Sequence, residues 1–320
     1  MSLRIIRALR REGVLGINRR NTGYTLRWNA RRFYPIVDDK LTTKERCQSA
    51  GIPVPALLAV ARHHFEIPRL LREIATLDAF VLKPSHGAMG NGILVVRARD
   101  GVRFERAGGR WIGERDLRYH AASIISGLYA LGGQIDDAFV EERILVHPAL
   151  EDVATDGLPD LRVIVYRGVP VMSMTRLPTL RSAGRANLHQ GAVGAGVDLG
   201  DGRFTHAVQE NRPVSRHPDT DHPLIGHAVP HFERALEIAV AATDLTGLGY
   251  VGADVVVDAA RGPLVLELNA RPGLAIQLAN RAGLLPRLHA VDARITPGIP
   301  LAERIALGRD IAKHAQGKFA

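Results

Sequence analysis

The sequence predicts an α+β fold, in which hairpins of β-strands alternate with helices. Three observations lead to this prediction. Short apolar runs end at glycine-containing turns, as at Arg167-Gly168 between 161–166 and 169–175. Longer amphipathic stretches, such as 229–246, have the length of helices. The chain has no internal repeat, heptad run or low-complexity tract, and its 320 residues, 46% of them hydrophobic, can bury a sizeable core.

The individual elements are expected in the following order. A first helix lies at 3–12, and Thr42 opens a second that Gly51 ends, because Ile52-Pro53-Val54-Pro55 cannot continue it. The strands expected further along are 56–60, 80–84, 93–96, 138–142, 161–166, 169–175, 251–257 and 263–269. The remaining helices are expected at 66–76, at 115–131 before Gly132-Gly133, at 229–246 before Gly247, and at 300–314. The polar stretch 206–226 is expected to form a loop.

Composition narrows the class of protein. The formal net charge is +9, and much of the excess lies in residues 1–40, which suggests either a solvated basic surface or an acidic partner or substrate. Aromatic residues make up only 5%, which argues against a stacking platform for nucleic acid. No apolar run reaches the length of a membrane span, and the single cysteine, Cys47, is interpreted as structural. We therefore expect a cytoplasmic protein.

A glycine-rich turn follows the apolar strand that ends at Lys83. The sequence from Ser85 to Gly92 contains Gly87, Gly90 and Gly92. Glycine lets backbone N–H groups approach a phosphate closely, and a lysine at the strand end supplies a positive charge to it. The pattern differs from a Walker loop and from a dinucleotide fingerprint. Without other motifs, an ordinary glycine-rich hairpin explains it equally well.

A pair of acidic strands late in the chain is the more specific signal. If 259–262 form a hairpin loop, Asp258 faces Pro263 and Asp254 faces Glu267, while Glu267 and Asn269 share one face. Two carboxylates directly opposite each other repel, so such a pair among apolar neighbours needs a cation. Their hard oxygen ligands suit magnesium that is shared with substrate phosphates.

Arginines and a second acidic pair lie between these motifs. Arg162, Arg176, Arg181 and Arg185 precede Asn187, and Arg271 follows Asn269; guanidinium groups bind phosphate and carboxylate through two hydrogen bonds. Taken singly, each could equally be a surface charge. Glu141 and Glu142 end an apolar strand, where they could hold adenine and ribose or face solvent.

In this order the motifs resemble the ATP-grasp superfamily, and most of all the RimK-like α-L-glutamate ligases. The resemblance extends from about Asp39 to Leu285. Its most specific parts are Leu266-Glu267-Leu268-Asn269-Ala270-Arg271-Pro272-Gly273 and Arg185-Ala186-Asn187-Leu188-His189-Gln190-Gly191. It implies an ATP-grasp fold, in which two α/β subdomains sandwich ATP behind a reduced N-terminal module. The implied divisions are 1–40, a basic segment; 41–140, with the glycine-rich loop; 141–290, with the metal site; and 291–320, a helical tail.

The resemblance also implies a role for each candidate residue. The nucleotide would be held by Lys44, Lys83, Ser85, Gly87, Gly90, Gly92, Glu141 and Glu142. The metal ligands would be Asp254, Glu267 and Asn269. Catalysis would use Arg162, Arg176, Arg185, Asn187 and Arg271. The implied cofactors are ATP and Mg²⁺, as two ions, with Mn²⁺ as a substitute.

The reaction implied is ADP-forming ligation of a carboxylate to an amine through an acyl-phosphate. The acid would be a small molecule or a peptide, and the chain could act as a homodimer. Two alternatives remain open at this point: an ATP-grasp kinase that phosphorylates a hydroxyl, and a non-catalytic homologue that binds nucleotide. Loss of the acidic trio would favour the second alternative, but all three residues are present.

Overall fold

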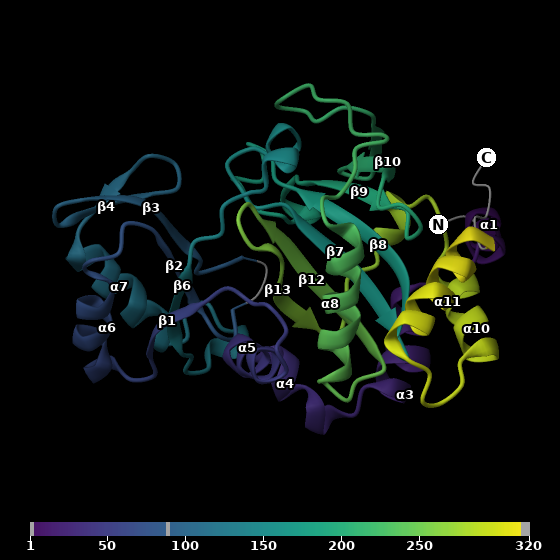
Figure 1. Ribbon diagram of the computed structural model, residues 1–320, viewed down its shortest axis with the longest axis horizontal. Helices are drawn as coiled ribbons and strands as arrows, with labels where there is room; N and C mark the ends of the chain where they lie inside the picture. The colour runs from purple at the N-terminus through teal and green to yellow at the C-terminus, as the bar shows by residue number, and fades with distance from the viewer. Residues whose placement is uncertain (1–2, 88–89, 315–320) are drawn as a thin grey trace. The chain divides into compact units, whose positions relative to one another are not determined.

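The computed structural model describes residues 3–87 and 90–314, and it confirms the α+β fold with two antiparallel sheets. The chain forms two compact units (Figure 1). The smaller unit comprises 38–41 and 54–145. The larger contains the chain up to residue 37, residues 42–53 and everything from 146 onward. The N-terminal segment therefore packs with the late part of the sequence.

The smaller unit is built on a six-stranded sheet in the order β1-β6-β2-β3-β4-β5. Its strands are β1 (Leu57–Ala61), β2 (Phe80–Pro84), β3 (Leu94–Asp100), β4 (Arg103–Arg106), β5 (Trp111–Ile112) and β6 (Ala138–Glu142). Helices α6 (Ile67–Ile74) and α7 (Glu114–Ile125) pack against the sheet and against each other. The predicted β2–β3 hairpin is confirmed, with Val81 opposite Val95.

One helix of this unit is shorter than predicted. The expectation that it reaches residue 131 is wrong, because α7 ends at Ile125 and the chain reverses at Gly127. Gly127 has a φ of 79°, and a Cβ added there would lie 2.3 Å from the carbonyl oxygen of Gln134. Only glycine fits this close approach, so the helix stops before Gly132-Gly133.

The larger unit contains a seven-stranded sheet in the order β11-β10-β9-β8-β7-β12-β13. The strands are β7 (Asp160–Tyr166), β8 (Val169–Leu177), β9 (Val193–Val197), β10 (Phe204–Gln209), β11 (Arg212–Val214), β12 (Tyr250–Asp258) and β13 (Gly262–Asn269). Helix α8 (Phe232–Asp244) packs on β12, β13 and β7 (Figure 1). Its alanines 235, 239 and 242 are fully buried, which lets the helix lie close to the sheet.

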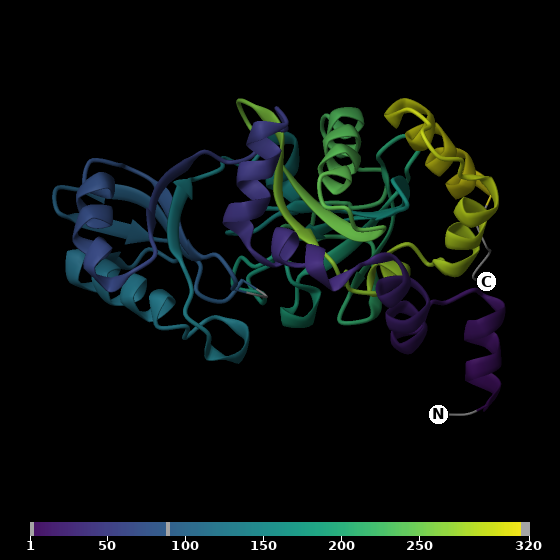
Figure 2. The ribbon, with the colours of Figure 1, turned by 90° about the horizontal axis from the view of Figure 1, so that it is seen from below.

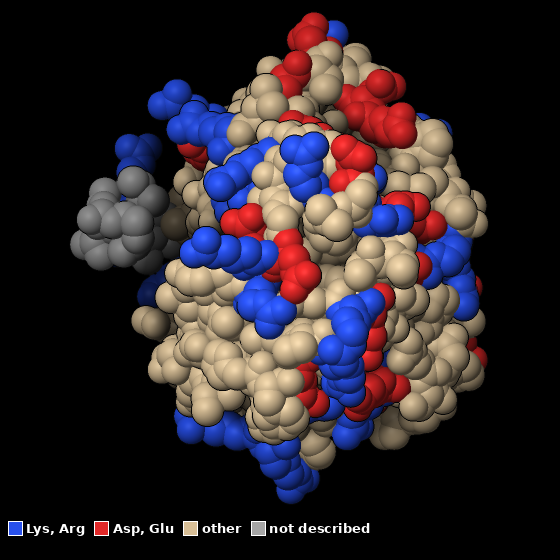
Figure 3. Space-filling view, turned by 90° about the vertical axis from the view of Figure 1, so that its left-hand side faces the viewer, with Lys and Arg blue, Asp and Glu red and all other residues tan. Residues whose placement is uncertain are grey.

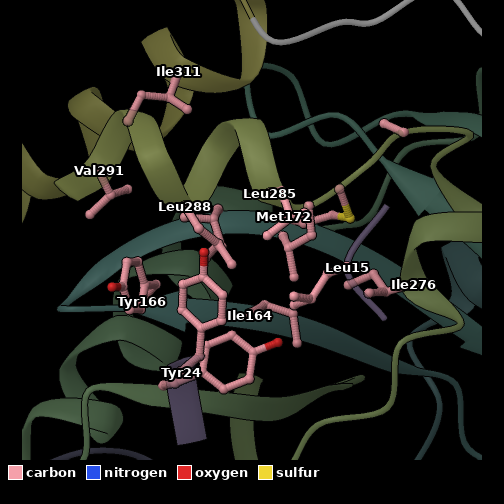
Figure 4. Close-up of a cluster of buried hydrophobic side chains, with 14 of the residues drawn as sticks. Leu15, Tyr24, Ile164, Tyr166, Met172, Ile276, Leu285, Leu288, Val291 and Ile311 are labelled. Atoms are coloured by element: carbon pink, nitrogen blue, oxygen red, sulfur yellow. The ribbon is translucent and has the colours of Figure 1, made fainter. Parts of the chain in front are cut away.

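Helices late in the chain cover another part of this sheet. α9 (Ile276–Ala279), α10 (Leu285–Arg294) and α11 (Leu301–His314) contribute to one apolar cluster with strand residues such as Ile164 and Met172 (Figure 4). Burial of these side chains is the main source of stability for this end of the sheet.

The N-terminal segment is held by the same part of the unit. Its elements are α1 (Leu3–Arg11), α2 (Ile17–Arg19), a short π-helix (Arg20–Thr25), α3 (Leu26–Trp28), a 3-10 helix (Arg31–Phe33), α4 (Pro35–Asp38) and α5 (Lys40–Ser49). In both ribbon views the purple α1 lies beside the yellow α10 and α11, and the N–H of Leu285 at the start of α10 donates to the carbonyl of Gly13 at 3.0 Å (Figures 1 and 2). Arg20 is buried and donates to the carbonyl of Pro272 at 3.0 Å, so part of the basic segment is structural.

The prediction of a loop over 206–226 is wrong for its first part and correct for 215–226, which forms turns with one isolated bridge between Arg216 and Pro223. In the first part, β10 and β11 pair, with Val208 opposite Pro213, and extend the sheet. β9 was not predicted either, because its sequence Val-Gly-Ala-Gly-Val contains two glycines, which weaken the sequence signal for a strand. The structure explains one of them: a Cβ on Gly196 would lie 2.3 Å from the carbonyl oxygen of Ala279 at the end of α9.

The surface and the cysteine complete this description. Figure 3 shows one face of the molecule, on which basic and acidic side chains are interspersed. None of the helices in the described part of the chain has the length and apolar character to cross a membrane. Cys47 is fully buried on α5, and burial raises the pKa of its thiol to about 11. A buried thiol of raised pKa is unreactive, which fits a structural role.

We expect Asn29→Ala to destabilise the larger unit by about 2 kcal/mol or more. The buried Asn29 amide bonds both backbone groups of Tyr250 and the carbonyl of Ala270, at 2.8–2.9 Å. Its loss leaves these buried groups unpaired. Denaturant unfolding would measure the loss, with the exposed Asn18→Ala in the same segment as the control. Equal stabilities of the two variants would contradict this role for Asn29.

Candidate functional site

One end of the larger sheet carries charged side chains on a single face. In the strand pairing, Asp254 of β12 lies opposite Arg162 of β7 on one side and Glu267 of β13 on the other. One step further, Asp160 lies opposite Arg176 of β8. Residues two apart on a strand, or directly opposite across a ladder, share a face. The strand register thus gathers five charges from four strands.

Asp254 is the centre of this cluster and is completely buried. Its Oδ1 accepts from Nε of Arg162 at 2.7 Å, and its Oδ2 accepts from Nη2 of Arg162 at 2.6 Å and from Nη2 of Arg176 at 2.7 Å. Burial alone would raise the pKa of Asp254, but the two guanidinium groups reverse the effect and hold it below its usual range. The carboxylate is therefore ionised and firmly bound.

Arg176 connects Asp254 to a second buried carboxylate. Its Nε and Nη2 donate to the two oxygens of Asp160, each at 2.6 Å. Burial raises the pKa of Asp160 to about 6 although Arg176 acts in the opposite direction, and the Asp254 charge adds to the rise. For Arg176, burial would lower the pKa, but Asp160 and Asp254 together raise it above its usual range. Arg176 is thus a fixed positive charge between two carboxylates.

Glu267 and Asn269 complete the polar face. Nδ2 of Asn269 donates to Oε1 of Glu267 at 3.1 Å and lies 3.4 Å from Oδ2 of Asp254. The Glu267 side chain is 30% exposed and lies 4.0 Å from Nη2 of Arg162. The three predicted ligands thus lie together, and the predicted pairing of Asp254 with Glu267 is confirmed.

At the tip of the β12–β13 hairpin, the residue pairing differs from the prediction. Asp258 pairs with Gly262 and not with Pro263, because a bulge beside Asp254 shifts the register and the loop contains three residues. Oδ1 of Asp258 accepts from the backbone N–H groups of Ala260 and Arg261, both at 3.0 Å, which stabilises this loop. Among the described residues, no three His, Cys, Asp or Glu side chains form a metal-binding group.

Lys83 and Glu141 form a buried ion pair in the smaller unit. Both side chains are almost fully enclosed, and Nζ of Lys83 also lies 5.2 Å from the centre of the Phe139 ring. Glu142 is turned the other way: its carboxylate accepts from the backbone N–H of Ala56, while its own N–H donates to the Ala56 carbonyl at 3.0 Å. Glu141 and Glu142 therefore differ in setting, and Glu142 holds the edge strand.

The glycine-rich loop is anchored at its beginning. Ser85 bonds the carboxylate of Asp39, and Nζ of Lys40 donates to the carbonyls of Ser85 and Gly87. Asp39 also accepts from the N–H of Leu41 at 2.9 Å, so α5 begins at Lys40 and not at Thr42 as predicted. Gly90 and Gly92 both have positive φ, and residues 88–89 of the loop lie outside the described residues.

A histidine in this loop had no predicted role. Nδ1 of His86 lies 2.8 Å from the carboxylate of Asp136, which also accepts from the backbone N–H of His86 at 3.0 Å. Asp136 is buried, whereas the His86 side chain is 47% exposed. Fifty residues separate the two in sequence, so no local pattern indicates the pair.

The other predicted residues are scattered over the larger unit. Arg185 is exposed, and Asn187 is half-buried and caps a short turn by accepting from the N–H of His189 at 3.0 Å. Arg271 is exposed and lies over the Tyr34 ring, 4.9 Å from its centre. Lys44 is buried on α5. The structure thus brings together Arg162, Arg176, Asp254, Glu267 and Asn269; the roles of all predicted site residues stay predictions.

Replacement of Arg162 by Met should lower the free energy of unfolding by about 3 kcal/mol, because Asp254 stays buried with half of its charge partners removed. Chemical denaturation at neutral pH would measure the loss. Arg203→Met removes an exposed ion pair with Asp201 and should change stability little. If both variants unfold at the same denaturant concentration, the ion pair around Asp254 does not hold the sheet together.

Known proteins resemble this chain in sequence and in fold. A family model described as sugar-transfer associated ATP-grasp matches residues 19–293. None of the curated proteins compared with the chain matches it. Among solved structures, the ATP-grasp ligase PsnB complexed with minimal precursor is 17% identical, with a TM-score of 0.41; the match covers 87% of this chain and 64% of the PsnB chain.

Two further solved structures give similar values. D-cycloserine synthetase DcsG is 13% identical over 89% of this chain and 71% of its own, with a TM-score of 0.43. D-alanine–D-alanine ligase from Bacillus anthracis is also 13% identical, over 88% and 68%, with a TM-score of 0.42. These likenesses concern the fold alone, and a special kinship with RimK-like ligases stays a prediction. Because the family model covers most of the sequence, the chain belongs to the sugar-transfer associated ATP-grasp family and has the ATP-grasp fold.

Proposed function

We propose that this protein is an ATP- and magnesium-dependent ligase that joins a carboxylate to an amine and forms ADP. The observation that carries the proposal is the charge of the polar sheet face. Three carboxylates (Asp160, Asp254 and Glu267) face two guanidinium groups (Arg162 and Arg176), which leaves one net negative charge beside the side-chain amide of Asn269. Such a face can bind a divalent cation and still present arginines to anionic substrates.

The donor set fits magnesium, with one condition. Glu267 is partly exposed, and its carboxylate suits a hard cation. Asn269 faces Glu267 through Nδ2, and its amide oxygen, the other end of the same group, is the atom that would bind the ion. Oδ2 of Asp254 accepts from both arginines and Oδ1 accepts from Arg162, so a cation would have to use the second lone pair of Oδ1 or displace a guanidinium. Bound magnesium, proposed as two ions that Mn²⁺ can replace, would neutralise charge on the phosphate oxygens.

For the nucleotide we propose the residues of the glycine-rich loop and its flanking strands. Lys83 would pair with phosphate, the backbone at Ser85, Gly87, Gly90 and Gly92 would surround it, and Glu141 would meet the base. Lys44 is proposed as a second nucleotide lysine. Because Glu142 bonds Ala56, it contributes by holding the strand. Glycine is favoured at Gly90 and Gly92 by a positive φ, and at Gly87 because a Cβ there would collide with the Pro84 ring.

The proposed reaction has two steps. A carboxylate oxygen of the acid attacks the γ-phosphorus of ATP; the bond to the bridging oxygen breaks, and ADP leaves. The amine nitrogen then attacks the acyl carbon, phosphate leaves, and the nitrogen loses a proton as the amide forms. Arg162, Arg176, Arg185, Asn187 and Arg271 would position the anionic groups and stabilise developing charge. No side-chain nucleophile is required.

The acid and the amine are proposed only by class. The acid is a small-molecule or peptide carboxylate, with glutamate suggested by the resemblance to RimK-like ligases, and the acceptor is an amine. We place the reaction in the cytoplasm and propose a homodimer as the working form.

Glu267→Ala should reduce ADP formation by about 100-fold or more while the fold stays intact, because the partly exposed carboxylate is removed from the proposed metal site. ADP release would be measured with a panel of amino acids and peptides, and mass spectrometry would identify a new amide. Glu237→Ala, which replaces a partly exposed glutamate on α8, is the matched control. Wild-type ADP formation without an amine, together with a stable phosphorylated product, would point to a kinase. Near-normal turnover of folded Glu267→Ala would contradict the role of Glu267.

Lys83→Met should weaken ATP binding about tenfold, since one charge-assisted contact to phosphate is lost. Isothermal titration with a non-hydrolysable ATP analogue would measure the affinity, and circular dichroism would check the fold, because Glu141 loses its buried partner. The exposed Lys313→Met on α11 serves for comparison. An unchanged affinity of folded Lys83→Met would remove Lys83 from the nucleotide site.

A further inference from the structure

The larger unit contains a cavity of about 240 Å³ that none of the predicted site residues lines. It lies where the turn between β9 and β10 meets the end of α9, the start of α10 and the side of α11. Its charged and polar walls come from Asp198, Thr205, Asn280, Arg281 and Arg287, and the remaining lining residues are aliphatic.

Arg287 is the unusual member of this lining. It is only 6% exposed, and its Nη1 donates to the carbonyl of Val171 at 2.8 Å. Its Nε is buried, and the described residues offer it no acceptor. Burial lowers the pKa of Arg287 to about 10, and the charge of Asp198 opposes this effect only in part. A buried guanidinium without a bonded carboxylate is costly, which indicates that a ligand supplies the missing acceptor.

The electrostatics of the cavity favour a negative ligand. Arg281 contributes a second guanidinium, and its charge, after the effect of burial, lowers the pKa of the nearby His206. Asp198 is the opposing charge, and its Oδ1 already accepts from the N–H of Gly200 at 2.6 Å. Two guanidinium groups and one carboxylate leave a net charge of +1 with His206 neutral.

We propose that this cavity binds a small anion whose phosphate or carboxylate oxygens accept from Nε of Arg287. The fork of a guanidinium matches both groups, because adjacent N–H donors reach two oxygens at once. At about 30 Å³ for each water, the cavity has room for roughly eight water molecules. It is smaller than the about 300 Å³ at which sites for drug-sized ligands begin, which favours an anion smaller than a nucleotide.

A bound anion would add contacts between the elements that line the cavity. Arg287 already connects α10 to β8 through Val171, and Arg309 of α11 donates to the carbonyl of Leu199 at 2.9 Å beside the same cavity. An occupant would add bonds between the β9–β10 turn and α10. We therefore expect binding to stabilise the larger unit. This inference does not depend on the proposed ligase activity.

The test is thermal unfolding of the full-length protein in inorganic phosphate and in acetate, each against sodium chloride of equal ionic strength. The wild type should gain about 2 °C or more in midpoint temperature with at least one of the two anions. Arg287→Met should lose this gain. Arg294→Met on the same helix, which removes an exposed ion pair with Asp310, should keep it. Comparison with Arg287→Met also removes the general salting effect of phosphate and any phosphate bound at the nucleotide site.

Two results would overturn the proposal. One is a wild type that gains nothing from either anion, and the other is an equal gain in wild type and Arg287→Met. If Arg287→Met does not fold, calorimetric titration with phosphate and acetate compares the wild type with Arg287→Lys, which keeps the charge but lacks Nε. About tenfold weaker binding in Arg287→Lys supports the proposal. Equal affinity, or no binding by the wild type, contradicts it.

Discussion

The structure of the larger unit depends on keeping the buried Asp254 carboxylate ionised. Removal of a carboxylate from water is so unfavourable that an unpaired one would take up a proton. Three hydrogen bonds of 2.6–2.7 Å from Arg162 and Arg176 prevent this. Those arginines stand on two strands, so the carboxylate is stabilised only when β7, β8 and β12 have their observed register. A shift by one residue would turn Arg162 to the other face and leave the charge unpaired.

A few residues from the charged cluster, the same face of the sheet is apolar. Ile164 lies two residues beyond Arg162 on β7, and it is opposite Met172 of β8; both belong to the apolar cluster beneath α10 and α11 (Figure 4). Desolvation of this cluster fixes the strands independently of the charges. The apolar end can therefore supply the stability, while the charged end carries a face that would be too costly to assemble alone. The stability of the apolar end thus offsets the cost of burying Asp160 and Asp254 at the charged end.

The sequence predicts contacts between residues that are close in the chain better than contacts between distant ones. The predicted β12–β13 hairpin and the predicted pairing of Asp254 with Glu267 are confirmed. Both could be predicted because a short loop joins the two strands and because acidic residues are unusual within apolar runs. The counter-charge was assigned to a metal, whereas in the structure Arg162, 92 residues away, binds Asp254. Its register is set by tertiary pairing, which leaves no local pattern. β9 to β11 were missed for a different reason: glycine and polar residues serve close packing and sheet edges there, and neither resembles an alternating strand.

The arginines around Asp254 also constrain how a metal could act at this site. A divalent cation and a guanidinium compete for the same carboxylate oxygens. Either one can supply the positive charge that the buried Asp254 carboxylate needs. If a cation took one Asp254 oxygen, the released N–H donors of Arg176 would still be held by Asp160, whose two oxygens already accept from it. For Arg162, Glu267 at 4.0 Å is the other carboxylate within ion-pair distance in the described part of the chain. Exchange at Asp254 would therefore free Arg162 more than Arg176 to meet an anionic substrate. Binding of the cation and of the acid would then be coupled through one buried carboxylate.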